Sequence, residues 1–270
     1  MNKQLIARYA LDGAVHYGIV DKSTLRRLTG QPFDGIHESG HRDELSRAKL
    51  LAPVPMPRIF GLGYNYKAHS QESHKAVPDI PVLFMKPSTS AIGPDEAIVY
   101  PSDGENIHFE GELTIIVGKQ GRHVPESRAL EYIFGYTCGN DVSDRVLQRR
   151  ESAFGCLLAG KGYDTFAPLG PFIATGLDPS DLRVITRVNG DVRQDGNSRD
   201  LVFPVPHLIA YLSKYMTLLP GDVIMTGTPG GVGPLSVGDS VEVEIPGIGV
   251  LRNRVVAEAE TANPHATVAI

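Results

Sequence analysis

Two glutamates separated by a single glycine are the first side chains in this sequence whose type and spacing could do chemistry. Glu110 and Glu112 lie within residues 107–117, where apolar residues alternate with others, so a strand would place both glutamates on one face. A half-buried strand with a solvated acidic face explains that pattern, and it is the commoner case for an isolated pair. Two neighbouring carboxylates repel each other unless a cation separates them, so a third oxygen ligand would indicate a metal site instead.

Asp141 is the third carboxylate that could join such a site. It follows an apolar segment and precedes residues 143–150, whose apolar spacing predicts a helix. At that position an aspartate can also be the N-cap of the helix, and Asp144 would then be an acid in the first turn that answers the helix dipole. Read alone, Asp141 fits the cap and the metal ligand equally well.

A histidine and a lysine add functional groups of a different kind. His69 and Glu72 are three residues apart, so one turn of helix would bring the carboxylate beside the imidazole, although an exposed helix pair has the same spacing. Lys161 lies in residues 155–162, which nearly match a phosphate-binding loop. That loop needs Ser or Thr after the lysine, and Gly162 has no hydroxyl, so nucleotide hydrolysis is disfavoured.

The elements that must position these residues are mostly short strands. Residues 5–20 predict a hairpin about an Asp12-Gly13 turn, and the proline-rich residues 53–57 predict an extended connector. Many of the 29 glycines and 20 prolines separate further β-like runs beyond the connector. We therefore expect a mainly β protein with some α, in which a small β-rich N-terminal domain, residues 1–52, precedes a β sandwich or roll. Helical spacing is clear only at residues 127–134, 143–150 and 206–216.

Composition and charge argue against several classes of partner. The 270 residues are 41% hydrophobic and carry a formal net charge of −5, and adjacent basic residues occur only at Arg26-Arg27 and Arg149-Arg150. A nucleic-acid partner is not expected, because no basic stripe is available for phosphates. No uninterrupted apolar stretch is long enough for a signal peptide or a membrane span, so a cytoplasmic protein without a membrane partner is predicted.

Five ordered motifs together resemble the fumarylacetoacetate hydrolase family, and the likeness extends over residues 58–256. The resemblance implies that these residues form a catalytic domain with the mixed β-sandwich roll of that family, and that the protein is a homodimer. We expect residues 257–270 to form a C-terminal tail. The motifs are residues 63–72, 84–88, 110–112 together with 139–143, 160–166 and 221–233.

The resemblance also implies roles for individual side chains. Mg²⁺ or Mn²⁺, or failing those Ca²⁺, would be held by three carboxylates, a His/Glu pair would activate water, and a lysine would offset the developing negative charge. Residues 73–78 would form a lid over bound substrate. The metal ligands would be Glu110, Glu112 and Asp141, the His/Glu pair would be His69 and Glu72, and the lysine would be Lys161. The substrate contacts would be Lys86, Gln148 and Thr228.

The implied reaction is cleavage of a C–C bond in a 2,4-dioxo acid of the acylpyruvate or fumarylpyruvate type, with release of pyruvate or a similar 2-oxo acid. The His/Glu pair suits water activation, which favours this hydrolase. An isomerase of the 2-hydroxyhepta-2,4-diene-1,7-dioate type, or a decarboxylase such as one for oxaloacetate, is the second interpretation. A non-catalytic binding protein of the same fold would be expected to lack one of these residues, and the sequence keeps all of them.

Overall fold

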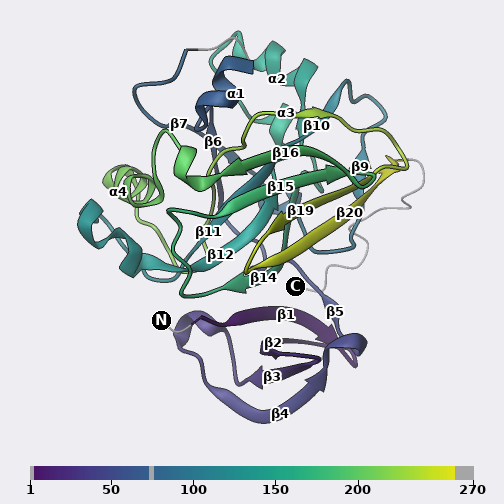
Figure 1. Cartoon of the computed structure of the whole chain (residues 1–270), viewed down its shortest axis with the longest axis vertical. Helices are drawn as coiled ribbons and strands as arrows, with labels where there is room; N and C mark the ends of the chain where they lie inside the picture. Colours follow the sequence, from purple (N-terminus) through teal and green to yellow (C-terminus); the bar gives the residue numbers. More distant parts are fainter. Residues whose placement is uncertain (1–2, 73–75, 259–270) are drawn as a thin grey trace.

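Two packed sheets form most of the protein, in a computed structural model that describes residues 3–72 and 76–258. The expected mainly β fold with some α is confirmed. Figure 1 shows a large main body, with a smaller lobe made by the N-terminal strands beneath it. Of the predicted lid, residues 73–78, the first three residues lie outside the described part of the chain.

The N-terminal lobe begins with the predicted hairpin. Strands β1 and β2 pair in antiparallel register, and the two turn residues both have positive φ, 50° at Asp12 and 80° at Gly13. Positive φ at both central positions matches the twist of a tight hairpin, and glycine adopts it without strain. The strands of the lobe are β1 (Leu5–Leu11), β2 (Ala14–Asp21), β3 (Thr24–Leu28), β4 (Glu38–Glu44) and β5 (Lys49–Leu50).

One large sheet runs from this lobe into the main body, in the order β4-β3-β2-β1-β14-β12-β11-β17-β6-β7. The two parts meet where β1 pairs with β14, with Leu5 opposite Ala174 and Ile6 opposite Ile173. Ile6 also shares an apolar cluster with Ile116 of the main body. The further strands of this sheet are β6 (Ile59–Gly63), β7 (Val82–Lys86), β8 (Ala91–Ile92), β11 (Gly111–Val117), β12 (Ile133–Asn140), β14 (Ala167–Ala174) and β17 (Val223–Met225).

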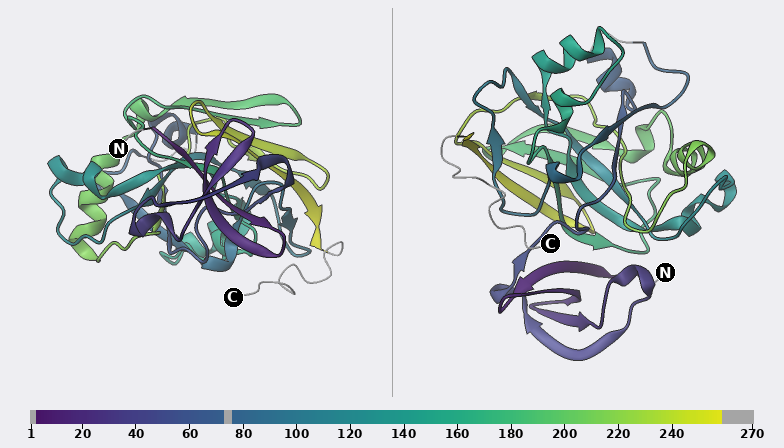
Figure 2. Two further views of the ribbon diagram at one scale, coloured as in Figure 1. Left: turned by 90° about the horizontal axis from the view of Figure 1, so that it is seen from below. Right: turned by 180° about the vertical axis from the view of Figure 1, so that it is seen from behind.

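The lobe and the main body are distinct in shape but share strand pairing and an apolar cluster (Figure 2). The predicted division into residues 1–52, 58–256 and 257–270 therefore stays a prediction about independent domains. Of the predicted C-terminal tail, the structure describes Ala257, which ends the last strand, and Glu258. The rest of that tail lies outside the described residues.

A second sheet packs against the large one and completes the sandwich, in the order β16-β15-β19-β20-β9. Leu113 and Ile115 of β11 share an apolar cluster with Val184, Val243 and Ile245 of this sheet. A small third sheet has the order β13-β10-β18. The strands are β9 (Ile98–Tyr100), β10 (Ile107–Phe109), β13 (Ser143–Asp144), β15 (Arg183–Val188), β16 (Asp191–Asn197), β18 (Gly233–Pro234), β19 (Ser240–Ile245) and β20 (Gly249–Ala257).

The helices lie at the periphery, and α1, α2 and α3 lie at the end of the main body that is opposite the N-terminal lobe (Figures 1 and 2). Within the described residues, none is long and apolar enough to cross a membrane. The helices are α1 (Lys67–Glu72), α2 (Arg145–Ser152), α3 (Ala159–Gly162) and α4 (Val205–Tyr215), with 3-10 helices η1 (Pro32–Asp34), η2 (Leu45–Arg47), η3 (Ser88–Ser90), η4 (Glu126–Tyr132) and η5 (Ser198–Asp200).

The helix predicted over residues 127–134 is in fact the 3-10 helix η4, and β12 begins at Ile133. A short apolar run fits the helical and the strand periods equally, and here the pairing of β12 with β11 decided the outcome. The helix predicted over residues 206–216 agrees with α4 to within one residue at each end.

Helix α2 begins later than predicted, because Asp144 still pairs with β10 before the helix starts at Arg145. The Oδ1 atom of Asp144 accepts hydrogen bonds from the backbone N–H groups of Val146 at 2.9 Å and Leu147 at 3.0 Å. Asp144 is therefore the N-cap of α2. The interpretation that made Asp141 the cap and Asp144 a first-turn acid is wrong.

Replacing this cap should cost stability. We expect Asp144→Ala to lower the free energy of unfolding by about 1–2 kcal/mol, because the N–H groups of the first helical turn lose their acceptor. The other carboxylate oxygen of Asp144 also accepts from the backbone N–H of Glu105 at 2.9 Å. Urea unfolding followed by circular dichroism measures the change, with the exposed Asp191→Ala on β16 as a control. Equal stability of Asp144→Ala and the wild type would contradict the assignment.

Candidate metal centre and active site

The backbone around the two glutamates is fixed from both sides. The N–H of Glu110 donates to Oδ1 of Asn140 and the N–H of Gly111 donates to Oε1 of Gln194, each at 2.9 Å. A Cβ atom at position 111 would lie 1.9 Å from Oγ1 of Thr186, so only glycine fits between the glutamates. Glu110 and Glu112 are 4% and 1% exposed. The interpretation of a solvated acidic face is therefore wrong.

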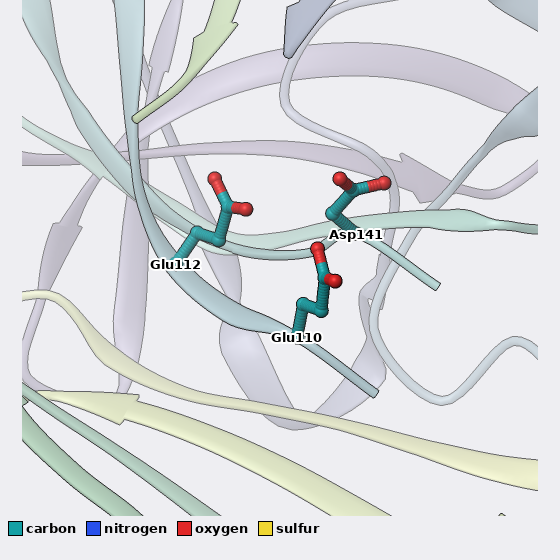
Figure 3. Close-up of side chains that lie close together, drawn as sticks. All are labelled: Glu110, Glu112 and Asp141. Atoms are coloured by element: carbon teal, nitrogen blue, oxygen red, sulfur yellow. The ribbon is translucent and has the colours of Figure 1, made fainter. Parts of the chain in front are cut away.

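Asp141 joins the glutamates because β11 and β12 pair with Gly111 opposite Asn140, which places the end of β12 beside the start of β11. The backbone N–H of Asp141 donates to the carbonyl oxygen of Glu110 at 2.9 Å. One oxygen from each of the three carboxylates lies within 4.8 Å of the others, and all three residues are buried. Figure 3 shows the carboxylates of this acidic triad directed into a common space.

Three cationic side chains contact the acidic triad. Nζ of Lys161 lies 2.8 Å from Oε2 of Glu110 and 2.7 Å from Oδ2 of Asp141, and it thus bridges the two residues. Nζ of Lys86 lies 2.5 Å from Oδ1 of Asp141, and Nη2 of Arg145 lies 2.5 Å from Oε1 of Glu110. Burial raises the pKa of Glu110, but Arg145 and Lys161 more than offset that effect, so this pKa lies well below its usual range.

Glu112 is the carboxylate of the triad that no described cation contacts. Its Oε2 accepts from the backbone N–H of Gly227 at 2.7 Å, while its buried Oε1 has no hydrogen-bond partner. Burial, together with the charges of Asp141 and Glu110, raises the pKa of Glu112 well above its usual range. A buried carboxylate oxygen without a partner, in a set made only of carboxylate ligands, fits a hard divalent cation such as Mg²⁺ or Mn²⁺.

A pocket of about 860 Å³ opens over Glu110 and Lys161. Helix α1 contributes His69 and Glu72 to its wall, and helix α2 contributes Gln148. With Thr228, which also lines it, the pocket brings together six residues predicted from the sequence. Glu112 and Asp141 are buried and do not belong to its lining.

His69 is buried at the pocket wall, with 6% of its surface exposed, so it is not the exposed helix residue that its spacing alone allowed. Its Nδ1 lies 3.7 Å from Oε2 of Glu72, which is too long for a hydrogen bond, and has no hydrogen-bond partner. Oε2 of Glu72 accepts instead from the backbone N–H of Gly231 at 3.0 Å. Burial lowers the pKa of His69, so the imidazole is a free base at neutral pH.

The three predicted substrate contacts differ in position. Gln148 and Thr228 line the pocket, whereas Lys86 does not. The Thr228 hydroxyl donates to the carbonyl oxygen of Gly111 at 2.9 Å and accepts from Gln194 at 2.7 Å, so it also holds the glutamate segment in place. Lys86 is 2% exposed and is paired with Asp141. Substrate contact by these three side chains stays a prediction.

Lys161 does not belong to a phosphate-binding loop. Helix α2, and not a strand, precedes Gly155, and the lysine lies in the short helix α3. Its ammonium group is already bound by two carboxylates of the triad. This arrangement lacks the strand, loop and helix that a nucleotide-binding lysine requires.

Comparison with known proteins agrees with this geometry. Residues 58–256 match the family model described as fumarylacetoacetate (FAA) hydrolase, C-terminal, which covers most of the chain. The chain belongs to the fumarylacetoacetate hydrolase family. Residues 5–53 match a second model, described as Rv2993c-like, N-terminal. The family predicted from the five motifs is thereby confirmed.

Three members of the fumarylacetoacetate hydrolase family illustrate its range. Human mitochondrial oxaloacetate tautomerase is 40% identical over 222 residues, which are 78% of this chain and 70% of that protein. The crystal structure of 5-carboxymethyl-2-hydroxymuconate delta-isomerase from Mycobacterium smegmatis is 42% identical with a TM-score of 0.87, covering 94% of this chain and 100% of that one. The structure of fumarylpyruvate hydrolase from Pseudomonas aeruginosa with Mn²⁺ and pyruvate is 34% identical with a TM-score of 0.73, covering 76% of this chain and 91% of that one.

Sequence reasoning missed several side chains that line the pocket. Arg145, Arg149 and Ser152 share one face of α2 with Gln148, and His108 lies on β10 two residues before Glu110. Arg145 lies three residues before the predicted Gln148, so the helical period could have pointed to it. Nothing in the local sequence marks His108, whose position depends on the pairing of β10 with β13.

Proposed function

We propose that this enzyme of the fumarylacetoacetate hydrolase family uses a divalent cation to interconvert the keto and enol forms of a 2-oxo acid. The observation that carries the proposal is the buried imidazole of His69, whose Nδ1 has no hydrogen-bond partner and which shares one pocket with Lys161 and Glu110. The transfer of a proton from carbon to oxygen requires a base that accepts the proton and a cation that stabilises the negative oxygen, and this pocket contains both. The tautomerase and isomerase relatives support this choice.

Five residues of the site have a part in that reaction. His69 takes the proton from the carbon next to the 2-oxo group, a C=C bond forms, and the electrons of the C=O bond move to the oxygen, which receives the proton. Lys161 stabilises the negative charge on that oxygen. Glu110, Glu112 and Asp141 would hold the divalent ion, which supplies Lewis-acid stabilisation to the same charge.

Hydrolysis of a C–C bond in a 2,4-dioxo acid, which the sequence favoured, is the second candidate. Its support is the fumarylpyruvate hydrolase with Mn²⁺ and pyruvate among the similar structures, together with the presence of both His69 and Glu72. Water activation needs the carboxylate to orient the imidazole, and the 3.7 Å separation of the two groups does not provide that hydrogen bond. For this reason we place hydrolysis after isomerisation.

A comparison of two substrates separates the candidates. With Mg²⁺ or Mn²⁺ present, we expect the protein to accelerate the approach of oxaloacetate to its keto–enol equilibrium, followed by the absorbance of the enol. Release of pyruvate from an acylpyruvate, without any effect on the enol of oxaloacetate, would overturn the proposal in favour of hydrolysis. Release of CO₂ from oxaloacetate at the same rate as loss of the enol would indicate a decarboxylase.

We also propose that the protein is a homodimer. Exposed apolar side chains near the pocket, among them Phe154 at 91% and Met85 at 46% exposed, would gain from burial against a second copy. Light scattering is expected to give twice the 29.2 kDa mass of one chain at micromolar concentration. A mass equal to one chain under those conditions would show that the proposal is wrong.

A further inference from the structure

One face of helix α2 forms a wall of the pocket that consists entirely of polar side chains. Arg145, Gln148, Arg149 and Ser152 are spaced i, i+3, i+4 and i+7, and all four line the pocket. Two guanidinium groups, an amide and a hydroxyl offer donors, whereas a carboxylate offers acceptors alone. No acidic residue of α2 belongs to this lining. The wall therefore suits a ligand with negatively charged oxygen atoms.

Arg149 is the cation of this wall that has no counter-ion in the part of the chain that the structure describes. Arg145 contacts Glu110 at 2.5 Å, and the neighbouring Arg150 contacts Glu105 at 3.2 Å. No acidic side chain among the described residues forms such an ion pair with Arg149. Because a guanidinium is charged at every physiological pH, the wall presents one positive charge that a ligand can neutralise.

The position of Arg149 places that charge away from the acidic triad. Arg145 contacts the triad directly, and Arg149 follows it by one helical turn, about 6 Å along the helix axis. Gln148 lies between them, and its Oε1 accepts from Nη1 of Arg145 at 3.0 Å, which leaves its amide nitrogen to donate to a ligand. A substrate held by its 2-oxo acid end at the triad would direct its other end toward Arg149 and Gln148.

The charges of the centre leave a place for a second negative charge on the substrate. The three carboxylates of the triad are equal in number to the three cations that contact it, two lysines and one arginine. A divalent ion adds two positive charges to this balance. Arg149 adds a third, and a 2-oxo acid with two carboxylates offsets one more of these charges than a 2-oxo acid with one carboxylate does.

We propose that Arg149 makes the enzyme selective for dicarboxylic 2-oxo acids, an inference that rests on the proposed function. The carboxylate at the end remote from the 2-oxo group is bound by the guanidinium of Arg149 and the amide of Gln148. Such a pair forms charge-assisted hydrogen bonds, which are about twice as strong as neutral ones. Arg149 determines specificity and takes no part in the proton transfer.

Calorimetric titration of the Mn²⁺-loaded protein with a matched pair of ligands tests this selectivity. 2-Oxoadipate and 2-oxohexanoate have the same number of carbon atoms and differ in whether a carboxylate or a methyl group ends the chain. We expect wild type to bind 2-oxoadipate at least about tenfold more tightly, as two charge-assisted hydrogen bonds would provide. In Arg149→Ala the two affinities become equal to within about twofold, through weaker binding of 2-oxoadipate. Higher salt reduces the preference of the wild type.

Arg150→Ala is the matched control, because it removes the adjacent arginine, which is paired with Glu105 and does not line the pocket. It should keep the preference of the wild type. The inference is overturned if wild type binds both ligands equally, or if Arg149→Ala keeps the full preference. A wild type that binds neither ligand would overturn the proposed function as well, so the two failures are distinct.

Discussion

Chelation of the divalent ion is expected to slow turnover of oxaloacetate by roughly a thousandfold or more, with recovery on addition of Mg²⁺ or Mn²⁺. The acidic triad has no positive charge with which to stabilise an enolate, and its three carboxylates would repel the enolate. Lys161 alone cannot replace the ion, because two of the three N–H groups of its ammonium donate to Glu110 and Asp141 and one is left for the substrate oxygen. The measurement is the rate of keto–enol conversion after dialysis against EDTA, with the residual metal determined independently.

The control for chelation is a protein dialysed against EDTA and returned to excess Mg²⁺, which should regain its full rate. Unfolding caused by loss of the ion would also stop turnover, so circular dichroism should confirm that the dialysed protein is folded. Undiminished turnover by protein that is shown to hold no metal would contradict the role of the triad.

His69→Ala is expected to reduce the rate of keto–enol conversion by about a hundredfold to ten-thousandfold, because it removes the group that takes the proton from carbon. Binding of Mn²⁺ should survive, since His69 contacts none of the three carboxylates in the described structure. Stopped-flow measurement of a single turnover at saturating Mg²⁺ separates this step from product release.

His207→Ala is the matched control for this substitution. His207 lies on α4, is paired with Glu126 at 3.2 Å and does not line the pocket, so its loss should leave the rate unchanged. A His69→Ala enzyme that converts oxaloacetate at the rate of the wild type would show that another group moves the proton.

The parts of the fold that could be predicted are those in which local sequence decides the structure. Asp12 and Gly13 specify a tight turn, and the alternating residues on either side of it form the hairpin. The apolar spacing of residues 127–134 is ambiguous, since the segment is a 3-10 helix as far as Tyr132 and only pairing with β11 makes β12 a strand from Ile133. The joining of the N-terminal lobe to β14 depends on a contact across some 170 positions of sequence, which no local pattern encodes.

The site could be predicted where residue type restricts the chemistry. Glu110, Glu112 and Asp141 were grouped before their distances were known because the motifs that contain them resemble those of the family, whereas their types and spacing alone left a solvated face and a helix cap open. Asp141 and Asp144 could not be told apart as the cap of α2, because the choice depends on where β13 ends. The ion pair between Arg145 and Glu110 was also hidden, since it needs α2 to lie beside the start of β11.

Titration with Mn²⁺ tests most directly the claim that the acidic triad holds a divalent ion. Calorimetry of the metal-free wild type should show one ion bound per chain. Glu112→Gln should weaken that binding at least about tenfold, because the ion loses a charged ligand whose Oε1 has no other partner. Glu131→Gln, the same change at an exposed glutamate paired with Arg128, should bind as the wild type does. Absence of binding by the wild type, or equal affinity in Glu112→Gln, would contradict the assignment of this metal centre.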